Sequence, residues 1–413
     1  MKRLVAACLL VAMSASAGTT APVELKRGVG LHQWLNWSPV SADGRYKSPP
    51  YRSVEQWLSS DRPLGDWPKG DPFRRIHALG FDFVRLTVDP GPLVADPARR
   101  PQILDQLSKD VKRLTDTGLK VVFDLHGVNQ VPAYSMQMIY DGADSEGVAR
   151  YREMLRPVAA MLAAIGTDKV ALEPYNEPAY YPCDASGTDD WQRIMTDTVK
   201  DIRAVSADLT IVATGACGGN ISGLTNLDPT FDDANILYSF HMYEPHSFTH
   251  QRSDTQGGFV SGFPWPARSG SPQTIIEGLA AHMTAAGLTT SQQDEAVAEL
   301  RKPIADYFKK NWDEAVLKAR IEEAVTWAQK HKIEPSRLFM GEFGVIRISE
   351  DGRAGAYDAD RLYYLKTVRQ TAEAHGIPWS VWEYSNPFGM SVIEPKGKAE
   401  PDDELMKAIG LSK

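Results

Sequence analysis

Cysteine is scarce in this sequence, with 3 residues among 413. Cys8 lies in an apolar stretch at the N-terminus, which leaves Cys183 and Cys217 in the body of the chain. The body can therefore contain no more than one disulfide. In an oxidising compartment this bond would close a loop of about 35 residues and stabilise the fold by about 3–4 kcal/mol. We expect the pair to be bonded, and two free buried thiols are the alternative.

Long apolar runs are absent beyond the N-terminus. Lys2 and Arg3 precede the apolar residues 4–13, and Ala15-Ser16-Ala17 offers a small-residue cleavage site. This pattern is typical of a secretory signal peptide, because the apolar run is well short of the roughly 20 residues that span a bilayer. No cysteine follows the run to carry a lipid anchor. We expect residues 1–17 to be removed and the mature chain, 18–413, to be periplasmic or secreted, without a membrane partner.

An excess of basic residues is also missing. The chain has 45 Lys and Arg against 53 Asp and Glu, a net charge of −8, which becomes −10 when Lys2 and Arg3 are removed. A nucleic-acid partner is therefore not expected, since phosphate binding needs a basic face. No Ser/Pro-rich linker, internal repeat or low-complexity tract divides the mature chain. We expect a single domain and a monomer.

What the sequence does contain is an alternation of short apolar strands and amphipathic helices. Eight strands are expected, at residues 27–32, 82–88, 119–125, 169–176, 209–214, 236–241, 337–343 and 378–382. Continuous apolar strands separated by helices indicate a parallel sheet that is covered on both faces. Eight such units favour an α/β fold of the closed (β/α)8 type, a TIM barrel with insertions, over two doubly wound domains.

Helices are expected at residues 73–79, 103–117, 146–165, 189–205, 291–331, 358–375 and 402–409, with a break at Pro303. The connection at residues 218–233 shows little helical pattern. Residues 244–275 form an insertion that is too long for an ordinary connection, so we expect it to have a function. Its aromatic residues and glycines suggest that it shapes one end of a cleft.

Polar and aromatic side chains collect at the carboxyl ends of the expected strands, which is where barrels of this type carry their sites. They are Arg85, His126, Asn176, Glu177, His241, Tyr243, Glu342 and Trp382. Each has a structural alternative when taken alone, such as a buried ion pair for Arg85 or core packing for Trp382. Eight such residues at strand ends are much harder to explain by chance.

Two of these residues are carboxylates on opposite sides of the expected barrel mouth. Glu177 follows the fourth strand and Glu342 lies on the seventh. Paired carboxylates support glycoside hydrolysis, metal binding or proton abstraction. A metal is disfavoured, because the other strand ends supply only His126 and His241 and no acidic cluster. We therefore expect neither a metal nor another cofactor.

As an ordered set, these eight residues resemble the signature of glycoside hydrolase family 5, the cellulase family. The resemblance covers about residues 26–390 and implies retaining hydrolysis of a β-linked polysaccharide or oligosaccharide. It implies that Glu177 is the acid/base and Glu342 the nucleophile. Arg85 and Tyr243 would hold Glu342 ionised, and Asn176 would bind the sugar 2-hydroxyl. His126 and His241 would bind hydroxyls or Glu177, and Trp382 would lie under the sugar before the scissile bond.

The substrate is less well defined by the sequence. Trp34, Trp37 and Trp265 are candidates for outer sugar subsites, with core or surface positions as the alternative. The residues after His126 match no cellulase, mannanase or β-1,3-glucanase pattern that we can assign. An exported endo-β-1,4-glucanase is the expected function. A β-mannanase or β-1,3/1,6-glucanase is the alternative, and a catalytically silent polysaccharide-binding barrel is a remote one.

Overall fold

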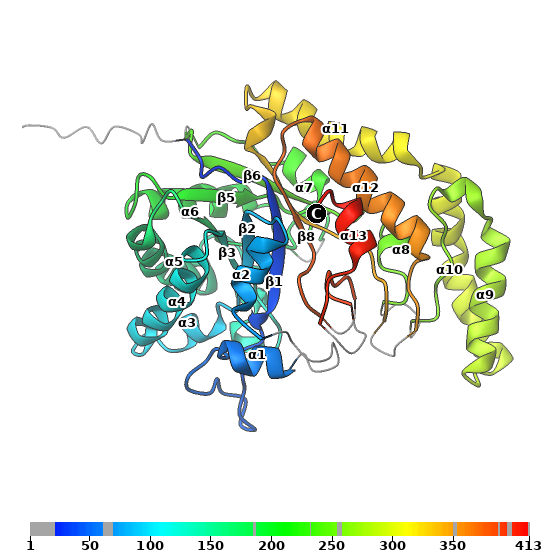
Figure 1. The fold of residues 1–413 in the computed structure, drawn as a ribbon, viewed down its shortest axis with the longest axis horizontal. Coiled ribbons are helices and arrows are strands. Elements are labelled where there is room, and N and C mark those ends of the chain that lie inside the picture. Colours follow the sequence, from blue (N-terminus) through cyan, green and yellow to red (C-terminus); the bar gives the residue numbers. More distant parts are fainter. Residues whose placement is uncertain are drawn as a thin grey trace, which may run out of the picture.

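The computed structural model forms a closed barrel in which eight parallel strands pair in sequence order, from β1 round to β8 and back to β1. It describes residues 21–60, 69–184, 187–231, 233–253, 258–349, 353–386, 389–394 and 399–411. The expected (β/α)8 barrel is confirmed (Figure 1). The predicted signal peptide, residues 1–17, lies outside the described residues. Among the described helices, none combines the length and the apolar character that a membrane crossing requires.

The strands are β1 (Arg27–Leu35), β2 (Phe83–Val88), β3 (Lys120–Leu125), β4 (Val170–Glu173), β5 (Thr210–Thr214), β6 (Ile236–Met242), β7 (Leu338–Phe343) and β8 (Trp379–Val381). Most lie within two residues of their predicted bounds. There are two exceptions: β1 continues to Leu35, past its predicted end at residue 32, and β4 ends at Glu173 rather than at residue 176. Pro174 follows directly, and a proline cannot donate a hydrogen bond to the ladder.

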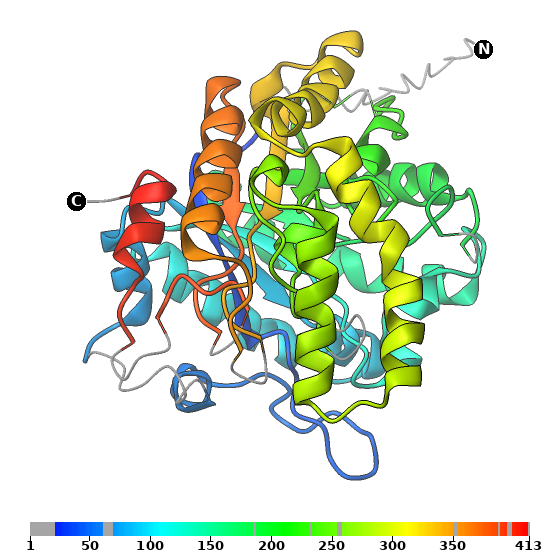
Figure 2. The ribbon, with the colours of Figure 1, turned by 90° about the vertical axis from the view of Figure 1, so that its right-hand side faces the viewer.

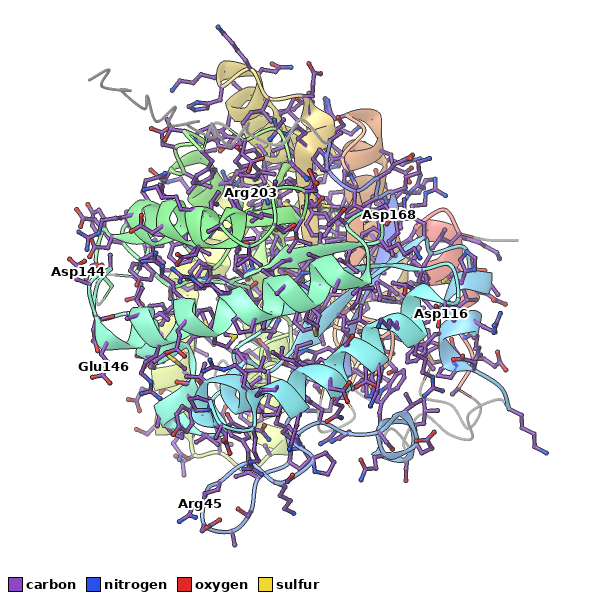
Figure 3. The ribbon with its side chains drawn as sticks, turned by 90° about the vertical axis from the view of Figure 1, so that its left-hand side faces the viewer. Arg45, Asp116, Asp144, Glu146, Asp168 and Arg203 are labelled. Atoms are coloured by element: carbon purple, nitrogen blue, oxygen red, sulfur yellow. A yellow bond between two sulfur atoms is a disulfide. The ribbon has the colours of Figure 1, made fainter. Side chains whose placement is uncertain are left out.

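Helices cover the outside of the barrel. The longer ones are α4 (Arg100–Thr115), α5 (Glu146–Ile165), α6 (Trp191–Arg203), α9 (Pro272–Ala285), α10 (Thr290–Lys310), α11 (Glu314–Lys330) and α12 (Asp358–Ala374). The short ones are α1 (Val54–Ser60), α2 (Pro72–Ala78), α3 (Gly91–Ala95), α7 (Ile221–Thr225), α8 (His246–Thr249) and α13 (Asp403–Ala408). Helices α4, α5 and α6 lie side by side over one flank of the barrel (Figure 3).

Helix α5 shows how the sequence sets such an element. Ser145 caps it by accepting a hydrogen bond from the Val148 N–H, and the helix ends at Gly166, whose φ of 140° favours glycine. Its buried side chains include Tyr151 and Leu155, which repeat at helical spacing. The helix thereby covers the barrel strands with one apolar face, between the Glu146 and Asp168 positions labelled in Figure 3.

The barrel interior is layered. A separate buried apolar cluster contains Phe83, Val122, Ala171, Val212, Leu237 and Phe339. Because side chains two residues apart on a strand face the same side, the next inward layer begins with Arg85, Asp124 and Glu173. These three are fully buried and charged. The apolar layer therefore closes the barrel beneath a polar layer that faces its carboxyl-end mouth.

The structure corrects two expectations about the helices. The predicted break at Pro303 is wrong, since this proline lies inside α10 on its exposed face. The chain breaks instead at Asn311, which adopts a left-handed conformation with φ 51° and ends α10 before Asp313 caps α11. Helix α9 was not expected at all. Together α9 and α10 form a hairpin that stands beside the barrel (Figure 2).

Cys183 and Cys217 form a disulfide, with their sulfur atoms 2.04 Å apart. Cys183 lies in the loop after β4 and Cys217 in the loop after β5. The bond therefore joins two neighbouring loops on the carboxyl-end side of the barrel. It is the arrangement expected from the sequence, rather than two free thiols.

Candidate active site

All eight predicted site residues lie at the carboxyl-end mouth of the barrel. Arg85, His241 and Glu342 are on strands β2, β6 and β7. The others follow strand ends, His126 after β3, Asn176 and Glu177 after β4, Tyr243 after β6 and Trp382 after β8. Hydrogen bonds, ion pairs and ring contacts connect all eight.

Arg85 is the buried centre of this group. Its guanidinium forms ion pairs with Glu173 at 2.7 Å, Glu342 at 2.6 Å and Asp124 at 3.0 Å. It also donates to the Asn176 Oδ1 atom at 2.7 Å. Burial works against the charged guanidinium, but the surrounding carboxylates together raise the pKa of Arg85 well above its usual value. The arginine is therefore a permanent cation under the site.

Glu342 is held by two donors. Arg85 Nη1 donates to its Oε1 atom at 2.6 Å, and the Tyr243 hydroxyl donates to its Oε2 atom at 2.8 Å. Its side chain is only 6% exposed. Burial, with Glu342 and Glu177 nearby, raises the pKa of Tyr243 well above its ordinary value, so the phenol stays protonated and donates. The two contacts hold the carboxylate in one orientation.

Glu177 lies in a different environment. Its side chain is 39% exposed, and its Oε1 atom is 2.7 Å from His241 Nδ1. Desolvation by the surrounding protein raises the pKa of Glu177, and the nearby His126 and Arg85 only partly oppose this shift. Burial lowers the pKa of His241 to about 4, so its imidazole is neutral near pH 7. Glu177 thus lies beside a neutral imidazole, whereas Glu342 contacts a cation and a phenol.

The two carboxyl groups are close together. An oxygen of Glu177, an oxygen of Glu342 and a ring nitrogen of His241 all lie within 4.8 Å of one another. Such a trio could in principle hold a metal ion. Both Glu342 oxygens, however, already accept hydrogen bonds, and the Arg85 cation contacts the same carboxylate. The arrangement fits a pair of reacting carboxyl groups better than it fits a cation site.

Asn176 is oriented by its neighbours. Because its Oδ1 atom accepts from Arg85, its Nδ2 group points toward His126 Nε2, at 3.3 Å. The other nitrogen of His126, Nδ1, is 2.8 Å from Asp124 Oδ2. Burial lowers the pKa of His126 to about 4 and raises the pKa of Asp124 to about 7. This chain of contacts places an amide donor at the mouth, beside Glu177.

An aromatic wall stands on one side of the carboxyl pair. The rings of Trp382 and His126 stack with centroids 5.7 Å apart, and His32 lies 4.7 Å from Trp382. Trp37 contacts His32 edge-on and donates from Nε1 to its Nε2 atom at 3.1 Å. Trp37, half-buried, is therefore next to the site.

The other two tryptophan candidates are wrong as sugar subsites. Trp34 is buried against Trp57 and Phe73, and Trp265 is buried against Phe248 and Tyr364. For Trp34 the reason is a register shift between Leu31 and Leu35. An irregularity of this kind breaks the alternation of side chains and turns Trp34 away from the mouth.

Three residues of the site were missed by the sequence reasoning. They are Asp124, Glu173 and His32, which contact Arg85, His126, Trp37 or Trp382. Asp124 and Glu173 did carry a signal, because each is a charged residue inside an otherwise apolar run. A carboxylate at such a position is buried only when it is paired. That reasoning would have placed both beside a cation such as Arg85.

Comparisons with known proteins agree with this geometry. Residues 51–387 match the family model described as cellulase (glycosyl hydrolase family 5). Endoglucanase 3 of Fibrobacter succinogenes is 26% identical over 400 residues, which cover 94% of this chain and 53% of that protein. The chain thus spans about half the length of that relative.

Solved structures share the fold. The clostridial cellulose synthase subunit Z from Clostridioides difficile has a TM-score of 0.62 at 20% identity, covering 94% of this chain and 100% of that one. Thermotoga maritima Cel5A in complex with mannotriose has a TM-score of 0.60 at 18% identity, covering 93% and 97%. At these identities the likeness concerns the fold alone.

Proposed function

The chain belongs to glycosyl hydrolase family 5, and we propose that it is an exported, retaining endo-β-1,4-glucanase in which Glu342 is the nucleophile and Glu177 the acid/base. The observation that carries the proposal is the approach of the two carboxyl groups to within 4.8 Å. Retaining enzymes hold these groups roughly 5–5.5 Å apart, whereas inverting enzymes leave about 6.5–9.5 Å for a water molecule. The spacing supports double displacement.

In the first step Glu342 attacks the anomeric carbon while Glu177 protonates the leaving oxygen. Glu342 suits the attack because Arg85 and Tyr243 hold both of its oxygens and stabilise its charge. Glu177 suits proton donation because desolvation raises its pKa, so that it carries a proton at higher pH than an ordinary glutamate. The C–O bond to the leaving sugar breaks and a glycosyl ester with Glu342 forms.

In the second step Glu177 acts as a base toward water. Once Glu342 is esterified its negative charge is gone, so Glu177 becomes more acidic and can exist as a carboxylate. His241 Nδ1, at 2.7 Å, can then donate to that carboxylate and orient it. Water attacks the anomeric carbon from the side that the leaving group vacated, Glu177 takes its proton, and Glu342 is released with retention of configuration.

Neighbouring groups would hold the sugar before the scissile bond. The Asn176 Nδ2 group is placed to donate to the 2-hydroxyl, a contact that strengthens in the transition state. Trp382 offers a half-buried ring face as a platform. His126 Nε2, at the mouth beside Asn176, can bind a further hydroxyl.

The β-1,4-glucan assignment rests on the endoglucanase relative from Fibrobacter succinogenes. A β-mannanase is the second candidate, because the similar Thermotoga maritima barrel was solved with mannotriose. A β-1,3/1,6-glucanase uses the same machinery, and a silent glycan-binding barrel is the candidate from another class. We further propose that residues 1–17 are a signal peptide and that 18–413 form one monomeric catalytic domain.

The test is activity on a panel of carboxymethylcellulose, mannan, xyloglucan and laminarin. We expect internal cleavage of the β-1,4-glucan and loss of that cleavage in both E342Q and E177Q. In time-resolved NMR, the first product should be the β-anomer. Binding of a glycan without cleavage by the unmodified protein would support the silent barrel, and an initial α-anomer would contradict retention.

A further inference from the structure

The connection from β6 to α11 contains a groove that the proposed chemistry does not yet use. This connection, residues 243–313, includes α8, the short turn Ala267–Ser269 and the α9–α10 hairpin. Between α8 and α10, which lie side by side in Figure 1, the groove has a volume of about 460 Å³. The sequence analysis expected the first part of this connection, residues 244–275, to shape one end of a cleft.

The groove adjoins the reacting carboxyl groups. Two of its lining residues, His246 and His250, lie against Tyr243, with ring centroids 6.3 Å and 5.0 Å from the tyrosine ring. Tyr243 in turn donates to Glu342. The groove therefore begins beside the tyrosine that holds Glu342.

The groove is distinct from the aromatic wall. Trp382 and His126 stack, His32 contacts both Trp382 and Trp37, and none of these four residues lines the groove. The sugar before the scissile bond would lie on that wall. The sugar after the bond must then lie beyond Glu177, since this residue protonates the oxygen that joins the two.

The lining of the groove suits a pyranose. Leu300 and Ile304 of α10, with Phe263, form an apolar side, while His246, His250 and Ser253 form a polar edge. Sugars present C–H faces and hydroxyl edges, and so pair with mixed surfaces of this kind. The His246 ring is exposed, and within the described part of the chain it makes no side-chain hydrogen bond. It is thus available to a ligand hydroxyl.

We propose that this groove binds the sugar units on the leaving-group side of the scissile bond, and that His246 is a specificity-determining residue for them. The inference rests on the proposed glycosidase function and deepens it. It assigns that half of the substrate cleft to an insertion built from α8 and the α9–α10 hairpin.

The test compares two substrates in unmodified protein and in H246A. Cellopentaose needs the leaving-group subsites, whereas 2,4-dinitrophenyl β-cellobioside carries a leaving group that is neither a sugar nor dependent on protonation. Loss of a hydrogen bond of about 1–1.5 kcal/mol should lower the ratio of kcat/KM for cellopentaose to kcat/KM for the aryl glycoside about five- to tenfold. H246Q, which keeps a donor, should recover part of the ratio.

The matched control is H77A, because His77 is also an exposed histidine but lies on α2. The ratio in H77A should equal that of the unmodified protein. An unchanged ratio in H246A, or an equal loss on both substrates, would overturn the inference while leaving the proposed function intact. Failure of the unmodified protein to cleave either substrate would overturn the proposed function, and the inference with it.

Discussion

At the scale of single residues, the site depends on one cation that forms ion pairs with several carboxylates. Arg85 contacts Asp124, Glu173 and Glu342, all in a buried environment. Burial raises the pKa of Asp124 to about 7 and raises the pKa of Glu173 as well. Burial thus opposes ionisation of these two carboxyl groups and the Arg85 cation partly offsets that effect, while Arg85 also forms an ion pair with Glu342.

Replacing Arg85 by lysine tests whether the site needs only a positive charge or also the geometry of the guanidinium. R85K keeps a positive charge but loses the planar fork that contacts Glu173, Glu342 and Asn176 together. We expect kcat to fall about 100-fold or more, because orientation and electrostatic stabilisation of Glu342 weaken. The measurement is kcat and KM on the preferred glucan, with R99K as a control at an exposed arginine. A change in KM alone would show that Arg85 does not act through Glu342.

Asp89, just beyond β2, should make stability fall as pH rises. It is fully buried, accepts a hydrogen bond from the Gly91 N–H, and has its pKa raised by burial to about 7. Because the folded pKa lies above the usual value of 3.8, the folded state binds this proton more tightly than the unfolded state. The stabilisation is complete below about pH 4 and is lost as pH rises toward 7.

D89N removes this titration, so it should flatten the pH dependence of stability between about pH 4 and 7. Urea unfolding of both proteins at several pH values gives the comparison. The free energy of unfolding of the unmodified protein should decline by up to a few kcal/mol relative to D89N over that range. Parallel curves for the two proteins would show that Asp89 does not titrate there.

At the scale of elements, the sequence predicted well wherever one local rule decided the outcome. Apolar runs located all eight strands, and glycines such as Gly166 located helix ends. The end of β4 was placed too late, at residue 176, although Pro174 comes earlier and ends the strand. Attention to every proline would have corrected it.

Two other misses differ in kind. Trp34 faces the core because of a register shift, which depends on the pairing of β1 with β2, so a single-sequence reading cannot place it. Helix α9 did carry a local signal, because Ser271 caps it and Pro272 begins it. Its pairing with α10, and the contact of α10 with α8, follow only from packing. The site residues were easier to find, because strand ends converge in any barrel.

The disulfide between the loops after β4 and β5 should stabilise the protein. Its cysteines are 34 residues apart. Closing a loop of that length lowers the entropy of the unfolded chain and thereby raises its free energy by about 3–4 kcal/mol. In C183S/C217S we therefore expect a free energy of unfolding lower by about this amount and a Tm lower by several degrees. Calorimetry with and without reductant supplies the control, because a reductant should destabilise only the unmodified protein. Equal stability of the two proteins would contradict this account.

At the scale of the whole molecule, the barrel interior has one layer that stabilises the fold and another that carries the candidate site. The apolar layer around Phe83 and Phe339 closes one part of the interior, and the charged layer around Arg85 lies above it. The layout places Glu177, which follows β4, and Glu342, which lies on β7, at one mouth whose rim is formed by long connections. Residues that are 165 positions apart in the sequence thus meet in one site.

The most direct test of this account is to trap the covalent intermediate. A 2-deoxy-2-fluoro-β-cellobioside with a good leaving group should form a glycosyl ester that turns over slowly, because the fluorine destabilises both transition states. Mass spectrometry of the digested protein should then find the sugar on the peptide that contains Glu342, with E342Q unlabelled. Labelling of Glu177 instead, or turnover of the reagent to an α-product without any covalent adduct, would contradict the assignment of Glu342 as the nucleophile.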